Sequence, residues 1–383
     1  MFDDLFQLVR SHFDTDDFIP LHEPRFSDLD KEYVADAIDS TFVSSVGAYV
    51  DRFEIELAEY VGAKRAIATV NGTSALQVTL RLVGVQTGDE VLTQALTFIA
   101  TANSIAYNDA HPVFLDVDRD TMGLSPDAVR SFLEEHAEKR GGGVYNTVSG
   151  RRIAAIVPMH TFGHPVRIVE LCALADEWGI PVVEDAAEAL GSTCRSHSCG
   201  TFGHVGVFSF NGNKTITCGG GGAIVTNDEA LADRAKHLTT TAKVPHRWEF
   251  EHDEIGYNYR MPNLNAALAC AQLKQLDRLL ADKRELACAY KKFFRSVDWS
   301  EYVDEPANCK SNFWLNAIIL PDFELRNSFL ETSNGARIMT RPVWKLMNEL
   351  KMYSHCQCGP LENSKWLEKR VVNLPSSARN RVG

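Results

Sequence analysis

The chain has 383 residues, of which 45% are hydrophobic, and its formal net charge is −12. This is ordinary globular composition, long enough for one large domain plus a smaller one. The acidic charge argues against a nucleic-acid partner, because phosphate contacts need clustered Lys and Arg.

The N-terminal stretch and the cysteines predict a cytoplasmic protein without a metal site. MFDDLFQLVR places two aspartates where a secretory signal carries positive charge, and no apolar run reaches the length of a membrane span. The nine cysteines are scattered, which argues against a disulfide framework in a chain of this size. Cys356 and Cys358 lie beside His355, but no second CxxC half completes a zinc pattern.

Short β-branched runs alternate with helix-length segments between about residues 60 and 240. Near-continuous apolar strands separated by helices predict an α/β fold with a buried, mostly parallel sheet covered on both faces. The runs VGVFSF and GGAIVT have no long helix between them, so we expect one of these two strands to run antiparallel. In chain order, the expected strands are 65–70, 89–94, 111–118, 153–159, 180–187, 205–210 and 221–226.

Two further segments organise the rest of the chain. The polar, glycine-rich stretch 140–152 is typical of an exposed loop. Apolar residues recur at helical spacing over 263–294, which predicts a long helix that begins near Pro262 and leads into a second domain. We therefore expect an N-terminal arm and large domain over 1–270 and a small C-terminal domain over 271–383.

Polar and aromatic residues follow the predicted strands at the sheet edge where ligands bind in open parallel sheets. Gly72, Thr73 and Ser74 open a helix, whose free N–H groups and dipole favour an anion, although Thr73 could also be a plain N-cap. Asp185 ends an apolar strand, where a buried carboxylate needs a cation or strong donors; it could instead cap the next turn. Phe98 follows another strand and is either an aromatic plate or plain core.

Lys214 stands between an apolar strand and four consecutive glycines, in FSFNGNKTITCGGGG. A phosphate-binding Walker loop is excluded, because Gly206 and Gly212 are too far apart and Asn213 separates Gly212 from the lysine. Two readings remain. Lys214 is either a solvated turn residue or a lysine in a partly desolvated site, which can lose its proton and form a Schiff base with a carbonyl.

Together these strand ends offer the four features that pyridoxal phosphate needs: a phosphate cradle, an aromatic plate, a buried carboxylate and a lysine. Residues 72–74 and Ser209 would bind the phosphate, and Phe98 and Ala187 would sandwich the ring. Asp185 would keep the ring nitrogen protonated, so that the ring accepts electrons. Lys214, 29 positions later, would carry the cofactor and then act as general base and acid.

Six blocks resemble, in order, those of the DegT/DnrJ/EryC1/StrS family of pyridoxal phosphate aminotransferases, which act on nucleotide-linked keto sugars. The resemblance runs from about residue 18 to 378. The blocks are NGTSAL, TFIATANSI, PVFLDVD, EDAAEALGS, GTFGHVGVFSFNGNK and GYNYRMPNLNAAL.

The resemblance implies an aspartate aminotransferase-like fold (type I), with a mostly parallel seven-stranded sheet and a smaller C-terminal α/β domain. It also implies a homodimer with both active sites at the interface, where Asn258 would reach the phosphate from the other subunit. Lys214 would be the Schiff-base lysine and Asp185 the ring-nitrogen partner. The implied cofactor-binding residues are Gly72, Thr73, Ser74, Phe98, Asp185, Ala187, Glu188, Ser209, Asn211, Lys214 and Asn258.

The resemblance also suggests substrates. Some family members carry histidine in place of the lysine and deoxygenate sugars, so Lys214 favours transamination. The flanking segments resemble the branch that aminates C4 of UDP-linked 4-keto-6-deoxy-N-acetylhexosamines in legionaminic acid and bacillosamine pathways for surface glycans. L-Glutamate is the expected amino donor. His160, Tyr259 and Arg260 are expected to bind substrate, although His160 could equally be a core histidine.

Two departures and three alternatives bear on the substrate. Glu188 stands where many family members have His or Gln beside the ring, and Gly220 replaces the glutamate of the commoner G-E-G-G. The alternatives within the family are a GDP-linked 4-keto sugar, a dTDP-linked 3-keto sugar, or a pyridoxal phosphate-dependent dehydratase. A pyridoxal phosphate-binding regulator would normally carry a DNA-binding module, and the sequence has no spare basic segment for one.

Overall fold

Seven strands form the centre of the larger, N-terminal part of the chain in a computed structural model that describes residues 1–379. They form two ladders, one of four strands and one of three. Isolated parallel bridges between Ile156 and Val182, and between Met159 and Asp185, connect the ladders edge to edge. In spatial order the strands are β1 (Arg65–Thr69), β11 (Gly222–Thr226), β10 (Val205–Ser209), β7 (Val183–Asp185), β6 (Ile153–Val157), β2 (Glu90–Gln94) and β3 (His111–Leu115).

The direction of these strands agrees with the α/β prediction and refines it. β10 pairs with β7 in parallel, and β2 pairs in parallel with both of its neighbours. β11 runs antiparallel to β1 and to β10, which confirms the expectation that one strand of the VGVFSF and GGAIVT pair is reversed. The seven strands do not form one continuous ladder, because only bridges connect β6 to the segment that contains β7.

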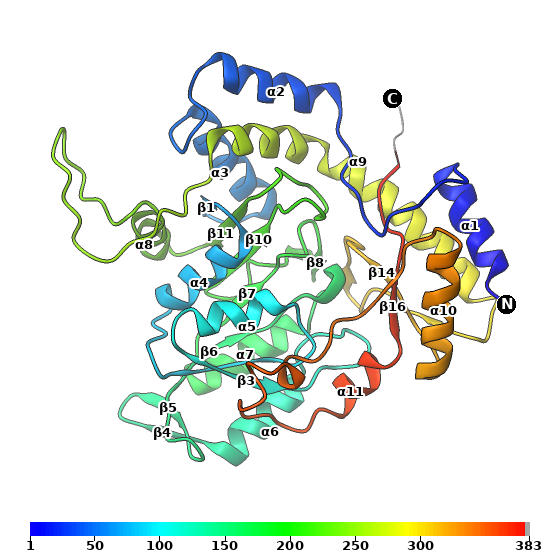
Figure 1. The fold of residues 1–383 in the computed structure, drawn as a ribbon. Coiled ribbons are helices and arrows are strands. Elements are labelled where there is room, and N and C mark those ends of the chain that lie inside the picture. Colours follow the sequence, from blue (N-terminus) through cyan, green and yellow to red (C-terminus); the bar gives the residue numbers. More distant parts are fainter. Residues whose placement is uncertain (380–383) are drawn as a thin grey trace.

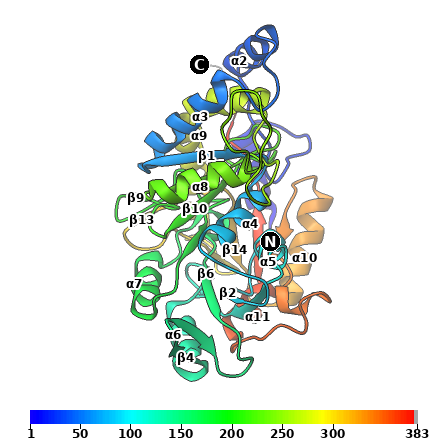
Figure 2. The same cartoon turned by 90° about the vertical axis from the view of Figure 1, so that its left-hand side faces the viewer.

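Helices cover both faces of this sheet (Figures 1 and 2). Successive side chains of a strand point to opposite faces. On β11, Ile224 packs with residues of α4 and α8, whereas Ala223 and Val225 pack with α3 and α9. The helices are α1 (Asp3–Phe13), α2 (Asp28–Asp39), α3 (Ala48–Val61), α4 (Gly72–Leu82), α5 (Ile99–Ala106), α6 (Pro126–His136), α7 (Ile168–Trp178), α8 (Glu229–Thr239), α9 (Asn263–Phe294), α10 (Phe323–Gly335) and α11 (Glu362–Glu368).

The helix α9 connects the large sheet to a second, antiparallel sheet near the C-terminus. It begins at Asn263 and ends at Phe294, as predicted. Its first half packs on the large sheet through residues such as Cys270, and its second half packs through Tyr290 on the C-terminal sheet. That sheet has the order β12 (Glu301–Tyr302), β14 (Asn316–Ile319), β16 (Val371–Leu374) and β15 (Arg341–Pro342).

The predicted boundary at residue 270 falls inside α9, so the division into 1–270 and 271–383 remains a prediction. The last four residues of the predicted C-terminal domain, 380–383, lie outside the described residues. The N-terminal helix α1 packs beside α10 and the C-terminal sheet, because Leu5 and Val9 share a buried cluster with Phe329 and Val372 (Figure 1). The N-terminal arm therefore belongs structurally with the C-terminal region.

The prediction of an exposed loop over 140–152 is wrong in part, because a hairpin forms there. β4 (Ala137–Arg140) and β5 (Gly143–Asn146) pair in antiparallel fashion around a two-residue turn. Gly141 and Gly142 have φ values of 56° and 81°. A tight hairpin turn of this kind requires positive φ at both positions, which glycine adopts without strain. The glycines that suggested a loop therefore serve as the turn.

Several short elements complete the chain. They are the strands β8 (Thr193–Cys194), β9 (His197–Ser198) and β13 (Cys309–Lys310), and the 3₁₀ helices η1 (Thr161–Gly163) and η2 (Met347–Glu349). The part of the chain that the structure describes contains no helix with the length and apolar character of a membrane span.

Gly206→Ala is expected to lower the free energy of unfolding by about 1–3 kcal/mol, as overpacked cores do. A Cβ at Gly206 in β10 would lie 2.0 Å from the backbone oxygen of Gly200, and backbone atoms move less readily than a flexible side chain. Gly212→Ala is the matched control, because nothing lies within 4 Å of its added Cβ. Urea unfolding measures both variants, and equal stability of the two would contradict the close packing of β10 against Gly200.

Candidate active site

Lys214 lies in the loop after β10, with its amino group between a carboxylate and an aromatic ring. Its Nζ is 3.3 Å from Oε1 of Glu188 and 4.1 Å from the centroid of the Trp314 ring. Only 12% of the lysine side chain is exposed. This placement excludes the reading of Lys214 as a solvated turn residue.

Asp185, at the end of β7, is a buried carboxylate held by neutral donors. The hydroxyl of Thr101 donates to its Oδ2 at 2.7 Å, and the backbone N–H of Ala187 donates to its Oδ1 at 3.2 Å. Burial raises the pKa of the Asp185 carboxyl, and these two bonds, Lys214 and His160 oppose that rise. Within residues 1–379 no cation lies within salt-bridge distance, so a cationic ligand atom would stabilise the charged form.

Ser209 and the N-terminus of α4 lie against each other, as a shared phosphate site at the ends of two strands requires. A Cβ at Gly72 would be 2.9 Å from Cβ of Ser209, so glycine is what permits this approach. Asn71 caps the helix, because its side chain accepts a hydrogen bond from the backbone N–H of Ser74 at 2.8 Å. Thr73 and Ser74 are half-buried. The first turn of a helix presents N–H groups without intrahelical acceptors, which suits a phosphate.

Phe98 is exposed rather than part of the core. It is the residue before α5, it is 45% exposed, and its ring lies 6.1 Å from that of Trp344. Thr101, three residues further along, bonds Asp185 and so connects the first turn of α5 to the buried carboxylate. Ala187 is half-buried two residues after Asp185. An exposed aromatic ring at this position is available for stacking on a planar ligand.

Glu188 is a second buried carboxylate, 3% exposed. Its Oε2 accepts the backbone N–H of Phe162 at 2.9 Å, while its Oε1 faces Lys214. Burial raises the pKa of Glu188 to about 7, although Lys214 and the Phe162 bond oppose the shift. A carboxyl group that titrates near neutral pH beside an amino group can exchange protons with it.

His160 is fully buried, and both of its ring nitrogens are hydrogen-bonded within the chain. Its Nε2 lies 3.0 Å from Oε2 of Glu184, and its Nδ1 accepts the N–H of Val166 at 3.2 Å. The backbone N–H of His160 donates to the backbone oxygen of Asp185 at 3.1 Å. This position favours the reading of His160 as a core histidine that supports the end of β7 over direct contact with substrate.

Four other predicted residues lie apart from the Lys214–Asp185 group or bond to other partners. Asn211 is exposed; its side-chain amide donates to Asn213 Oδ1 at 3.4 Å, and its backbone oxygen accepts the N–H of Lys214 at 3.0 Å. Asn258 is also exposed, and its side chain accepts from the guanidinium of Arg260 at 3.2 Å. Tyr259 donates to Gln77 Oε1 at 3.0 Å. The backbone of residues 258–260 runs past the end of β1, because the N–H of Val70 donates to the backbone oxygen of Tyr259.

Sequence reasoning missed three residues of the site. Thr101 carried a detectable signal, because it is a hydroxyl residue within the TFIATANSI block, one helical turn after Phe98. Trp314 and Asn312 carried no such signal, because they follow α9 in the sequence and approach Lys214 and Glu188 only in the folded chain. Asn312 Nδ2 donates to the backbone oxygen of Glu188 at 2.8 Å.

Pyridoxal phosphate fits these residues. The N-terminus of α4, with Ser209 beside it, suits the phosphate, and the exposed ring of Phe98 suits a planar ring. The buried carboxylate of Asp185, held only by neutral donors within the described part of the chain, suits a protonated pyridine nitrogen. Lys214 provides a partly buried amino group in the same site. The chemistry of this set of donors therefore agrees with the cofactor that the sequence predicts.

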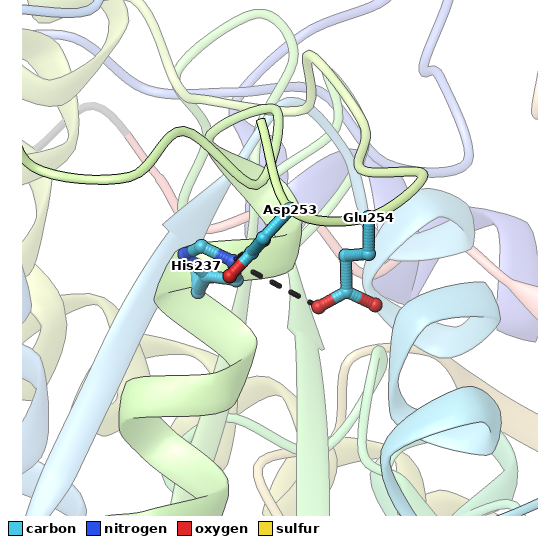
Figure 3. A group of neighbouring side chains, drawn as sticks. All are labelled: His237, Asp253 and Glu254. Atoms are coloured by element: carbon cyan, nitrogen blue, oxygen red, sulfur yellow. Dashed lines mark hydrogen bonds and ion pairs between the residues drawn. The ribbon is translucent and has the colours of Figure 1, made fainter. Parts of the chain in front are cut away.

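A cluster outside this site, His237, Asp253 and Glu254, connects α8 to the loop that precedes α9 (Figure 3). His237 Nε2 lies 2.7 Å from Asp253 Oδ1. Glu254 is paired with the guanidinium groups of Arg234 and Arg81. These two cations balance its negative charge, so the cluster needs no metal ion for that purpose. These bonds fix the base of a loop that extends from the body of the molecule (Figure 1).

Comparisons with known proteins find one family and related aminotransferases. Residues 24–380 match the model of the DegT/DnrJ/EryC1/StrS aminotransferase family. The chain is 37% identical over 366 residues to the "Putative pyridoxal phosphate-dependent aminotransferase EpsN" of Bacillus subtilis (strain 168), covering 94% of this chain and 91% of that protein. It is 37% identical over 361 residues to the GDP-perosamine synthase of Escherichia coli O157:H7, covering 94% and 93%.

Among solved structures, one similar protein is PseC of Helicobacter pylori, an aminotransferase involved in the biosynthesis of pseudoaminic acid. It matches with a TM-score of 0.85 at 25% sequence identity, over 94% of this chain and 93% of that one.

Glu188→Gln is expected to gain stability relative to the unmodified protein as the pH rises. The Glu188 pKa rises from an ordinary 4.5 to about 7 on folding, so between these values the folded state binds more protons than the unfolded state. The unmodified protein therefore loses stability across this window, by about 3–4 kcal/mol at ~1.4 kcal/mol per pKa unit. The amide does not titrate and escapes this loss.

Urea unfolding of cofactor-free protein between pH 4.5 and 8 measures the difference. Glu59→Gln on the exposed surface of α3 is the control for the loss of one negative charge. A Glu188→Gln difference that does not change with pH would contradict the shifted titration.

Proposed function

We propose a reaction for this chain from one premise: it belongs to the DegT/DnrJ/EryC1/StrS aminotransferase family, whose model matches residues 24–380. It is a pyridoxal phosphate-dependent aminotransferase, and the predictions of family, enzyme class and cofactor are confirmed. The proposed reaction is transfer of an amino group to a keto sugar linked to a nucleotide. The observation that carries it is the partly buried amino group of Lys214 beside Glu188, in one site with the buried Asp185.

The strand ends supply a separate group for each part of the cofactor. Ser209 and the first turn of α4 would hold the phosphate, with Thr73 and Ser74 as hydroxyl donors. Phe98 and Ala187 would lie against the two faces of the ring. Asp185 would pair with the ring nitrogen, a role favoured by its burial and by the absence of a salt-bridge partner among residues 1–379. When bound, pyridoxal phosphate supplies an electron sink for the carbon that loses a proton.

Lys214 performs the proton transfers in this proposal. Its amino group would take a proton from the amino donor and return one to the keto sugar after the amine is delivered, so that each half of the reaction uses the same base. Glu188, at 3.3 Å, is close enough to stabilise the protonated amine between these steps. Thr101 would keep the charge of Asp185 oriented while this occurs.

The acceptor is one of two sugar classes. The names of relatives such as GDP-perosamine synthase favour a GDP-linked 4-keto sugar. The terminal segments of the sequence resemble the branch that uses UDP-linked 4-keto-6-deoxy-N-acetylhexosamines. The comparisons support the GDP-linked acceptor more directly, and the UDP-linked acceptor is the second candidate.

A second subunit would complete the site, and L-glutamate is the proposed amino donor. Asn258 is exposed in the single chain and lies at the base of the loop that extends from the body (Figure 1), where it forms an antiparallel bridge with Thr240. In a homodimer this loop would bring Asn258 to the phosphate of the partner's cofactor. Arg260, which bonds Asn258, would then lie at the same interface and bind the substrate.

Borohydride reduction of the cofactor-loaded protein is expected to fix the cofactor on Nζ of Lys214 and on no other lysine. Peptide mapping by mass spectrometry locates the adduct. Lys214→Ala should bind cofactor without forming the adduct and should lose at least ~10³-fold in turnover, because one group performs all the proton transfers. Lys236→Ala, which removes a partly exposed lysine paired with Glu54, is the control. An adduct on another residue would remove the proposed role of Lys214.

A panel of GDP-, UDP- and dTDP-linked keto sugars, each incubated with L-glutamate, tests the acceptor. We expect amination at C4 of a GDP-linked or UDP-linked 4-keto sugar, with the position of the nitrogen located by NMR. Loss of the ketone without gain of nitrogen would show a dehydratase. Amination only at C3 of a dTDP-linked sugar would contradict both proposed acceptors.

A further inference from the structure

Trp314 is a buried indole that contacts the active-site lysine from the C-terminal side of α9. Its side chain is almost fully buried, at 5% exposure. The ring centroid lies 4.1 Å from Nζ of Lys214, within the range of a cation–π contact. Its Nε1–H donates to the backbone oxygen of Asn213 at 2.6 Å, the residue directly before the lysine. Trp314 therefore contacts both the amino group and the backbone that carries it.

A buried polar network fixes the position of this indole. The backbone N–H of Trp314 donates to Oδ1 of Asn312 at 2.8 Å, and Lys283 in α9 donates to the Trp314 carbonyl oxygen at 3.2 Å. The Asn312 amide also donates to the backbone oxygens of Glu188 and Leu190, at 2.8 and 2.9 Å. The same side chain thus holds both Trp314 and the segment that carries Glu188.

A glycine permits this network to form. Gly163 has a φ of +91°, and a Cβ there would lie 1.8 Å from Oδ1 of Asn312. Any side chain at this position would push the Asn312 amide away. The approach of the 311–315 segment to the site therefore depends on the backbone of η1, whose Phe162 in turn donates its N–H to Glu188.

We propose that Trp314 and Glu188 form a holding site for the amino group of Lys214 while that group is not bonded to the cofactor. The inference rests on the proposed function, in which Lys214 is free during the proton transfers. A charged amino group favours the face of an indole and a carboxylate, and both contacts weaken when the group is neutral. The holding site keeps Nζ in one position.

This arrangement gives Trp314 the role of a positioning residue. Its ring contacts the lysine nitrogen, and its burial excludes water from one side of that nitrogen. Desolvation strengthens a cation–π contact from roughly 0.5–1 kcal/mol at a surface to about 2 kcal/mol. Because Trp314 lies 100 residues after Lys214 in the sequence and beyond α9, the C-terminal region takes part in the site even though it supplies none of the predicted cofactor ligands.

Chemical labelling of lysine amino groups in cofactor-free protein tests the holding site without relying on turnover. Trp314→Leu removes both the ring face and the N–H, whereas Trp314→Phe keeps a ring face and loses only the N–H. At fixed neutral pH we expect Lys214 to react with an amine reagent about 2- to 30-fold faster in Trp314→Leu, the range that corresponds to a lost cation–π contact. Trp314→Phe should label at a rate closer to that of the unmodified protein. Mass spectrometry of the Lys214 peptide gives the rates.

Two controls separate positioning from a general loss of structure. Trp299→Leu removes an indole from the hydrophobic cluster beside α1 and should leave the labelling of Lys214 unchanged. Glu188→Gln removes the other side of the holding site and should also speed labelling. With cofactor bound and L-glutamate as the only substrate, Trp314→Leu should lower the maximal rate of the first half-reaction several-fold while the half-saturating glutamate concentration stays the same.

Each outcome decides the proposal. Unchanged labelling of Lys214 in Trp314→Leu would overturn it, and so would equal labelling in Trp314→Phe and Trp314→Leu, because the ring face would then contribute nothing. Faster labelling with rescue by phenylalanine supports it. The labelling uses no cofactor, so an adduct found on another lysine would refute the proposed function and leave this test of the Lys214 contacts intact.

Discussion

Burial of a carboxylate at the end of β7 is the constraint on which the rest of the site depends. Asp185 is 2% exposed, and its charge needs partners to remain in such a position. The chain supplies two neutral donors, Thr101 and Ala187, and no cation within salt-bridge distance in residues 1–379. The site is therefore built to accept a positive charge from a ligand. Pyridoxal phosphate, with a ring nitrogen that binds a proton, provides one.

The elements around β7 follow from this constraint. Thr101 reaches Asp185 because only residues 95–98 separate α5 from β2, and the same short connection brings Phe98 to this sheet edge. On the other side, the buried pair of His160 and Glu184 holds the end of β6 against β7. Glu184 also accepts the backbone N–H groups of Gly200, Phe202 and Gly203. His160 therefore supports the end of β6 through Glu184, and its contact with substrate remains a prediction.

The sequence predicts the residues that lie at the ends of strands, because strand order and burial can be read from local patterns. β1, β2, β7 and β10 were all expected within a few residues, and with them Gly72, Phe98, Asp185 and Lys214. Contacts across long separations leave no local signal. Trp314 and Asn312 stand in a run that reads only as a strand, and their approach to Lys214 depends on the path of the chain after α9. The hairpin at 137–146 was missed for a different reason: its two glycines are as compatible with an open loop as with a tight turn.

The charges of the buried groups explain why the site tolerates two carboxylates. The charge of Lys214 acts on both Asp185 and Glu188, although only Glu188 lies within salt-bridge distance of it. A bond between the lysine and the cofactor would weaken this support for both carboxylates. A protonated ring nitrogen would still pair with Asp185, whereas Glu188 would have lost its positively charged partner. The pKa of Glu188 is already raised to about 7 by burial, so this group takes up a proton near neutral pH with little cost. Glu188 can therefore stay buried through both states of Lys214, as an anion beside the free ammonium and as a neutral acid when the lysine is bonded.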